Sequence, residues 1–416
     1  MSVDDLRSYL DVSPSPFHAA VNAGERLKAA GFVELGEHDD WSDLPARGFV
    51  RRDGGLVAWL TPTGIPTDAP FRLAGAHTDS PCLRIKPRPD QTQMGWKQLN
   101  VEVYGGILNN SWLDRDLGIA GRLTCADGSE VLVDVDRPVA RVPQLAVHLD
   151  RTVNAEGLKL DTQQHLRPVW GVGSGRPGEF AEWIADAAGC EVPVTWELCL
   201  YDTQRAAVIG ADASLLASGR LDNLLSCWAA VGAIEGASPT DAVAMIVLND
   251  HEEVGSSSVT GAGGPLLERV LERHVLARGG DRDAFLRALA ASSCISADNA
   301  HAIHPNYADR HDPDHHPIVN AGPAIKINSN QRYATSSSTA AAFGRACDRA
   351  EVPHQVFVSR NNMPCGSTIG PITATRLGIA TVDVGVPQLS MHSARELCGV
   401  DDPPWLAAAL RAAFEL

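Results

Sequence analysis

Hydrophobic and polar positions follow different patterns along three successive stretches of the chain. In the first stretch, Ser15 and Pro16 mark a helix start, and apolar or small residues follow at helical spacing until Gly31. Two apolar runs, 55–60 and 71–76, are typical of strands. The second run leads directly into Ala-His-Thr-Asp, so that two side chains able to bind a metal follow a buried strand.

The second stretch, from about residue 83 to residue 214, has short apolar runs typical of strands. Examples are 99–104, 118–125 and 130–135, and the last two flank an Ala-Asp-Gly sequence that indicates a hairpin. Only 178–188 has the spacing of a longer helix. This stretch therefore predicts a β-rich domain.

In the third stretch, after about residue 215, strand and helix patterns alternate. The run 242–248 is apolar throughout, as in a strand that is buried on both faces. Further strands are expected at 294–297, 324–327, 355–359 and 379–384, and helices from residue 221 and at 266–276, 284–291, 336–350 and 373–377. Such alternation is typical of a sheet covered by helices on both faces.

Together the three stretches predict an α/β class fold with a discontinuous main domain. Residues 1–84 and 215–416 would form an α/β/α sandwich with a mixed sheet, split by a β-rich insert of residues 85–214. The 416 residues are 44% hydrophobic and 21% charged, which is ordinary for a globular chain.

Charge and cysteine content narrow the range of partners. The chain has 35 Lys and Arg against 51 Asp and Glu, a net charge of −16. We therefore expect neither a nucleic-acid backbone nor an anionic membrane surface as partner. Nine cysteines without a C-x-x-C pair disfavour a disulfide framework or a structural zinc knot. Because the N-terminus also lacks the apolar segment of a secretory signal, the expected location is the cytoplasm.

Histidine and carboxylate side chains recur just after predicted strands or at a helix start. The motifs are His77-Thr78-Asp79, Gly219-Arg220-Leu221-Asp222-Asn223, Asp250-His251-Glu252-Glu253, Ser296-Ala297-Asp298-Asn299 and Met391-His392-Ser393. Open α/β sheets bind ligands at the carboxyl ends of their strands. Two histidines and several carboxylates match the ligands of a zinc-like ion, and a pair of ions needs a bridging carboxylate.

Each of these residues also has an ordinary structural explanation when it is considered alone. Asp222 could be a first-turn helix acid, Asp298 a turn residue and His392 a surface histidine. Their common position at element ends favours the metal site. The adjacent acids Glu252 and Glu253 fit the same chemistry, because neighbours in an extended chain point to opposite sides. One carboxylate could bind metal while the other serves as a general base.

Seven sequence blocks carry these motifs and their surroundings, in order between about residues 13 and 400. They are AHTDSPCLRIKP, SGRLDNLLSCWAA, HEEVGSSSVTGAGGP, ISADNAHAIHPNYADRH, GPAIKINSNQRYAT, MPCGSTIGP and PQLSMHSARE. They resemble the motifs of the aspartyl aminopeptidase family of dinuclear zinc exopeptidases. The resemblance implies an α/β catalytic domain split by a β-rich dimerisation domain. It also implies a tetrahedral dodecamer built from dimers, and peptide substrates with acidic N-terminal residues.

The resemblance also implies a role for each residue of the site. Two divalent metal ions are expected, with zinc as the family metal and manganese or cobalt as alternatives. The implied ligands are His77 and Asp298 for one ion, Glu253 and His392 for the other, and Asp222 for both. Glu252 would be the general base, and Asp79 would orient His77.

Three further residues match family positions outside these motifs. His148, in the predicted insert, matches a histidine that reaches the active site of the neighbouring subunit; its ordinary explanation is a strand-end histidine. Lys326 and Tyr333 match positions that contact the substrate, and a lysine there could pair with an acidic side chain. Without the resemblance, Lys326 would equally well be a solvated lysine at a strand end.

The favoured function is a metal-dependent aminopeptidase with a preference for N-terminal Asp or Glu. One alternative is a co-catalytic metalloaminopeptidase of broad or neutral specificity. A second, from a different class, is a catalytically inactive metal-binding assembly subunit. The intact Asp222, Glu252 and Glu253 argue against this loss of activity.

Overall fold

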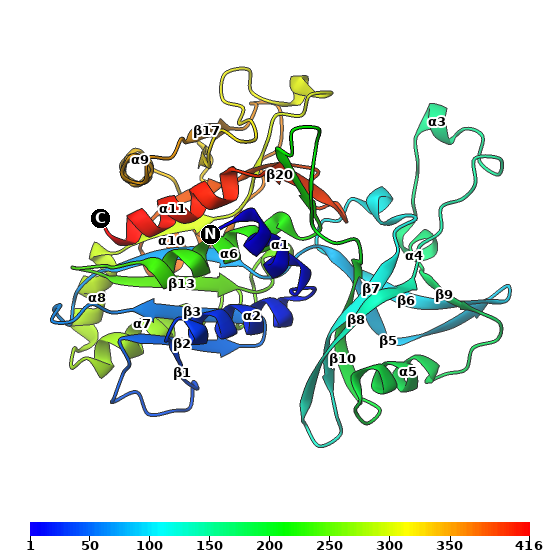
Figure 1. The fold of residues 1–416 in the computed structure, drawn as a ribbon, viewed down its shortest axis with the longest axis horizontal. Helices are drawn as coiled ribbons and strands as arrows, with labels where there is room; N and C mark the ends of the chain where they lie inside the picture. The colour runs from blue at the N-terminus through cyan, green and yellow to red at the C-terminus, as the bar shows by residue number, and fades with distance from the viewer.

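The computed structural model describes all residues from 1 to 416 and contains a large α/β part beside a smaller β-rich part (Figure 1). A nine-stranded mixed sheet forms the centre of the large part. In spatial order its strands are β1 (Val33–Glu34), β2 (Arg47–Arg52), β3 (Gly55–Leu60), β13 (Val243–Asn249), β4 (Phe71–His77), β14 (Ser293–Ala297), β18 (Ala380–Gly385), β16 (Ala324–Ile327) and β17 (Gln355–Val358).

The four middle strands, β13, β4, β14 and β18, run parallel to one another. All seven residues of β13 are buried, as its uninterrupted apolar sequence predicts. Because the strands are parallel, their carboxyl ends meet at one edge of the sheet. The segments that follow these strands are therefore brought together there.

Helices cover both faces of this sheet. One face carries α1 (Val3–Asp11), α2 (Pro16–Ala29), α6 (Leu221–Gly236), α9 (Ser337–Ala350) and α11 (Asp402–Phe414). The other face carries α7 (Leu266–Ala277), α8 (Arg282–Ala291) and α10 (Ile369–Leu377). No helix is both long enough and apolar enough to cross a lipid bilayer.

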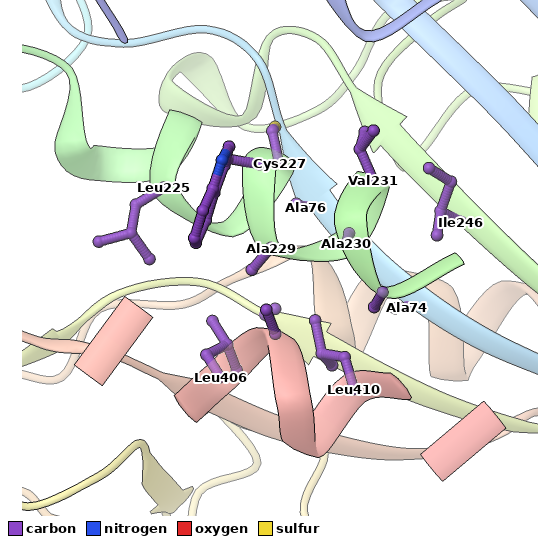
Figure 2. Close-up of a cluster of buried hydrophobic side chains, with 14 of the residues drawn as sticks. Ala74, Ala76, Leu225, Cys227, Ala229, Ala230, Val231, Ile246, Leu406 and Leu410 are labelled. Carbon is purple, nitrogen blue, oxygen red and sulfur yellow. The ribbon is translucent and has the colours of Figure 1, made fainter. Parts of the chain in front are cut away.

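Helix α6 lies at the centre of the larger core, between the sheet and α11. Figure 2 shows Leu225, Ala229 and Ala230 of α6 near Leu406 and Leu410 of α11. The small alanines allow close approach of the two helices, and 13 of the 16 residues of α6 are buried. A helix packed on all sides holds its first turn, which contains Asp222, in a fixed place.

A six-stranded antiparallel sheet forms the β-rich part. In spatial order its strands are β8 (Glu130–Ala140), β7 (Leu117–Thr124), β10 (Thr195–Asp202), β5 (Cys82–Gln93), β6 (Trp96–Tyr104) and β9 (Val169–Val172). Helix α5 (Glu179–Ala188) packs against it through Phe180 and Ile184, which belong to a core separate from the cores of the α/β part. The long connection after β8 contains two short helices, α3 (Val153–Glu156) and α4 (Thr162–His165).

The structure confirms the predicted fold class, an α/β sandwich with a mixed sheet and an inserted β-rich unit. It also shows elements that the sequence pattern did not predict, including α1, α11 and a third sheet. The strands of this third sheet are β11 (Ala207–Ile209), β12 (Leu215–Ser218), β20 (Glu396–Gly399), β19 (Pro387–Leu389) and β15 (Ala300–His301). With two to four residues each, these strands are too short to show a period of two.

Candidate metal centre

The predicted metal-binding motifs meet at the carboxyl edge of the nine-stranded sheet. His77 is the last residue of β4, and the Glu252-Glu253 pair follows β13. Asp298 follows β14 directly, and Asp222 is the second residue of α6. His392 lies in the connection between β19 and β20 of the third sheet.

Asp222 lies between two groups of side chains. Its Oδ1 atom is 3.3 Å from Nε2 of His77, and Asp298 Oδ1 lies 3.7 Å from the same nitrogen. The other carboxylate oxygen of Asp222, Oδ2, is 3.9 Å from Nε2 of His392. The same His392 nitrogen is 3.3 Å from Oε2 of Glu253. The five residues thus form two clusters, and Asp222 faces both of them.

The side chains fit the requirements of divalent cations. Imidazole nitrogens and carboxylate oxygens are the ligands that zinc and similar ions prefer. His77, Asp222 and Glu253 offer ligand atoms that lie within 4.8 Å of one another. Asp222 Oδ1 and Glu253 Oε1 are buried without a hydrogen-bond donor, a costly arrangement that a cation would relieve.

The electrostatics of the pocket also favour the binding of divalent cations. Burial, with the added repulsion of Asp298 and Asp222, raises the pKa of Glu252 to about 8, although His77 acts against this. Burial and the Asp222 charge raise the pKa of Glu253 well above its ordinary value. Several carboxylates that are buried close together are unfavourable when all of them are ionised. Divalent cations would supply the missing positive charge and lower these pKa values.

Asp79 connects His77 with the two glutamates. Its Oδ1 is 3.4 Å from Nδ1 of His77, and its main-chain oxygen lies 3.0 Å from the same nitrogen. The two carboxylate oxygens accept hydrogen bonds from the main-chain N–H groups of Glu252 and Glu253, each over 3.0 Å. The position of Asp79 therefore suits the orienting role expected of it.

Lys326 and Tyr333 line the same pocket, which has a volume of about 210 Å³. Lys326 is only 2% exposed, so the alternative explanation of a solvated lysine is wrong. Its Nζ atom donates to the Asn299 carbonyl over 3.1 Å and lies 3.8 Å from Asp298 Oδ2. The same atom is 5.0 Å from the centre of the Tyr333 ring.

Two predicted site residues, Asp79 and His148, do not line this pocket; Asp79 contacts it through His77, whereas His148 is remote from it. His148 lies in an exposed turn between β8 and α3, and it is absent from the pocket lining. Figure 1 shows that the segment with α3 projects away from the nine-stranded sheet. Within a single chain, His148 does not reach the metal centre.

Sequence reasoning missed Glu396, which orients two predicted ligands. Its carboxylate accepts the main-chain N–H of Asp222 over 2.9 Å and that of His392 over 2.8 Å, and the residue is only 2% exposed. Its place four residues after His392 could have drawn attention to it. Tyr104 and Gly106 were also missed, and both contact the site from the β-rich part. No pattern in their local sequence indicates this.

The fold and the site define an α/β protein with a divalent metal centre at the carboxyl edge of its sheet. A sequence profile described as "Aminopeptidase I zinc metalloprotease (M18)" matches residues 9–414. The chain therefore belongs to the M18 family of zinc aminopeptidases. This confirms the expectation of a metal-dependent aminopeptidase.

Relatives and solved structures agree with this assignment over almost the whole length. A protein named "Probable M18 family aminopeptidase 2" from Streptomyces coelicolor is 54% identical over 414 residues, covering 98% of this chain and 96% of the relative. Its namesake from Mycobacterium tuberculosis (strain H37Rv) is 50% identical over 420 residues, covering 98% and 96%. Among solved structures, Ape4 in the "Cryo-EM structure of the Ape4 and Nbr1 complex" has a TM-score of 0.94 at 33% identity, covering 99% of this chain and 85% of that one. The "Structure of S. cerevesiae mApe1 dodecamer" has a TM-score of 0.85 at 27% identity, covering 99% and 95%.

Proposed function

We propose that this protein is a dinuclear aminopeptidase that removes the N-terminal residue of peptides, preferentially Asp or Glu. The observation that carries the proposal is the position of Asp222, whose two carboxylate oxygens face different clusters. Oδ1 faces His77 at 3.3 Å, and Oδ2 faces His392 at 3.9 Å. A carboxylate that serves two ions needs this arrangement.

The ions would be held by the residues of the two clusters. His77 and Asp298 would bind one ion, Glu253 and His392 the other, and Asp222 both. Zinc is the proposed metal, with manganese or cobalt as alternatives. When bound, such ions polarise the scissile carbonyl and make water a stronger nucleophile at neutral pH.

The protein's own side chains would move the proton and hold the substrate. Glu252 lines the pocket beside Asp222 and Asp298, and its carboxylate would take a proton from the attacking water. The same carboxyl group would then return the proton to the leaving amine. Lys326 and Tyr333 would hold the side chain of the N-terminal residue.

A panel of aminoacyl chromogenic substrates tests this proposal, with metal analysis on the same preparation. The proposal predicts two ions per chain and faster hydrolysis of aspartyl and glutamyl substrates than of neutral ones. Equal rates for neutral and acidic substrates would favour the aminopeptidase of broad specificity. Two bound ions without hydrolysis of any substrate would favour the inactive assembly subunit.

Lys326→Met is expected to weaken hydrolysis of acidic N-termini more than that of neutral ones. The net charge of −16 repels acidic peptides at long range, so an acidic preference needs a local cation. Loss of one charge-assisted contact is worth about 1.5–3 kcal/mol, or on the order of tenfold to a hundredfold in kcat/KM.

The decisive quantity for Lys326 is the ratio of kcat/KM for aspartyl and alanyl substrates. Because Lys326 also lies near Asp298, the substitution can lower both values. An equal loss for the two substrates would show that Lys326 is not the specificity residue. Lys28→Met is a suitable control, since its ammonium group pairs with Glu25 and Glu34 away from the pocket.

We extend the proposal to assembly and location. Residues 85–214 would form a dimerisation domain inserted between residues 1–84 and 215–416, and dimers would assemble into a tetrahedral dodecamer. The dodecameric Ape1 structure supports the proposed dodecamer, because it matches 99% of the present chain. All nine cysteines are free thiols, which is consistent with a cytoplasmic location.

His148→Ala is expected to lower turnover about 10²–10³-fold, because we propose that His148 donates a hydrogen bond to the developing oxyanion in the partner's site. A mixing experiment tests the shared site. Inactive His148→Ala subunits are combined with inactive Glu252→Gln subunits under conditions that exchange protomers. In a mixed dimer, one site has Glu252 from its own chain and His148 from its partner.

Random exchange should restore up to about a quarter of the wild-type activity, since half of the dimers are mixed and each has one complete site. Mass spectrometry verifies that exchange took place. If exchange is complete and no activity returns, the shared-site proposal is wrong, and His148 has a structural role in its own subunit.

A further inference from the structure

Tyr104 ends strand β6, and residues 104–106 contact both clusters of the metal centre from the β-rich part. The Tyr104 hydroxyl donates a hydrogen bond to Asp79 Oδ2 over 2.8 Å. Two residues further on, the main-chain oxygen of Gly106 lies 3.0 Å from Nδ1 of His392. Asp79 adjoins His77 in one cluster, whereas His392 belongs to the other.

Tyr104 contacts Asp79, and Asp79 in turn contacts His77, Glu252 and Glu253. Asp79 is only 1% exposed, and its oxygens already accept the main-chain N–H groups of Glu252 and Glu253. The Tyr104 hydroxyl is a third donor to this carboxylate, so Tyr104 helps to fix the orientation of Asp79.

Tyr104 is itself held in place. Its side chain is buried, and the guanidinium of Arg84 lies 3.7 Å from the centre of its ring. Arg84 belongs to β5, which pairs with β6 so that Cys82 is opposite Tyr104. Burial and the charge of Asp79 raise the pKa of the Tyr104 hydroxyl well above its ordinary value, so it remains a donor at neutral pH.

The contact with His392 requires that the main chain of Gly105 and Gly106 lie close to the side chains of the metal centre. A Cβ atom on Gly106 would lie 3.3 Å from Nδ1 of His392, and one on Gly105 would lie 3.1 Å from Cβ of Glu253. Gly105 also has a φ of +70°, which glycine adopts without strain. Just beyond this segment, the N–H of Leu108 donates to the His392 carbonyl over 3.0 Å and fixes the main chain of His392 as well.

We infer that residues 104–106 position both clusters, so that the β-rich part controls the metal affinity of the α/β part. The inference rests on the proposed function, because it concerns the two-ion centre. Tyr104 is a positioning residue that acts through Asp79 and does not line the catalytic pocket. Partners that orient metal ligands in this way change metal affinity or activity by about 10–100-fold.

Tyr104→Phe tests the inference, since it keeps the ring against Arg84 and removes only the hydroxyl. Zinc affinity is measured by competition with a chromogenic chelator, and kcat and KM are measured with an aspartyl substrate. We expect zinc to bind about 10–100-fold more weakly, and kcat to fall more than KM rises. Gly106→Ala, which crowds His392, should also weaken zinc binding.

Tyr201→Phe is the matched control. The Tyr201 hydroxyl donates to Asp134 Oδ1 over 2.6 Å within the β-rich sheet, so its loss should leave zinc affinity and kcat near the wild-type values. Wild-type zinc affinity in Tyr104→Phe would overturn the inference, and so would an equal loss in Tyr201→Phe. Wild-type protein that lacks two ions or hydrolysis would instead contradict the proposed function.

Discussion

Glu252→Gln is expected to retain both metal ions and to lose at least about a hundredfold in turnover. The amide has nearly the same shape as the carboxylate, but it cannot accept a proton from the attacking water. Glu252 is not one of the five proposed metal ligands, whereas the adjacent Glu253 is 3.3 Å from His392. The substitution therefore separates the chemical step from metal binding.

Metal content and steady-state turnover are measured on the same sample of the Glu252 variant. Glu235→Gln is a suitable control. Glu235 is at the end of α6 opposite to Asp222, and it pairs with Arg26 at 3.7 Å. This control should retain wild-type turnover. A Glu252→Gln enzyme with full metal content and near wild-type turnover would rule out the general-base role.

Asp222→Ala is expected to release both ions and to abolish hydrolysis. The two carboxylate oxygens of Asp222 face different histidines, Oδ1 at 3.3 Å from His77 and Oδ2 at 3.9 Å from His392. In the proposed two-ion centre, the removal of Asp222 would take one ligand from each ion. Glu396 contacts residue 222 through its main-chain N–H, so it does not replace the lost carboxylate.

Metal analysis after gel filtration measures the expected loss in Asp222→Ala, and circular dichroism checks that the variant is folded. Asp222→Asn provides a second, more conservative variant, because it retains the side-chain volume but removes the charge. Two tightly bound ions per chain in either folded variant would refute the bridging role.

Three of the metal-binding motifs could be predicted because each follows a short apolar run that is typical of a buried strand. His77 ends β4, Asp298 follows β14, and the glutamate pair follows β13. The order of parallel strands then brings their carboxyl ends together. His392 is different, because it lies between β19 and β20 of the third sheet, whose strands are too short to predict. His392 is a candidate by its residue type, and its role as a ligand, like the roles of the other four residues, is what the resemblance to a family implies.

Contacts between the two parts of the molecule could not be predicted in the same way. Tyr104 and Asp79 are 25 positions apart; Tyr104 ends β6 of the antiparallel sheet, whereas Asp79 lies just after β4 of the nine-stranded sheet. Their contact depends on the register of β5 and β6, which shifts between Ile85 and Asp90. Such an irregularity depends on packing, and the local pattern of apolar residues does not reveal it.

The burial of Lys326 is a second feature that its local sequence does not reveal. In the run Ala324–Ile327, a lysine is as compatible with a solvated strand end as with a pocket. Its burial results from the surrounding Asn299, Asp298 and Tyr333, which come from other segments. The long side chain can reach these partners only once the sheet has formed.

The central claim is that two metal ions in one pocket support aminopeptidase activity, and a metal titration tests it most directly. Protein freed of metal by a chelator is titrated with zinc while the hydrolysis of an aspartyl chromogenic substrate is followed. The account predicts no hydrolysis without metal and a rise in rate that reaches its plateau at two equivalents per chain. Full activity in the metal-free protein, or a plateau at one equivalent, would contradict it.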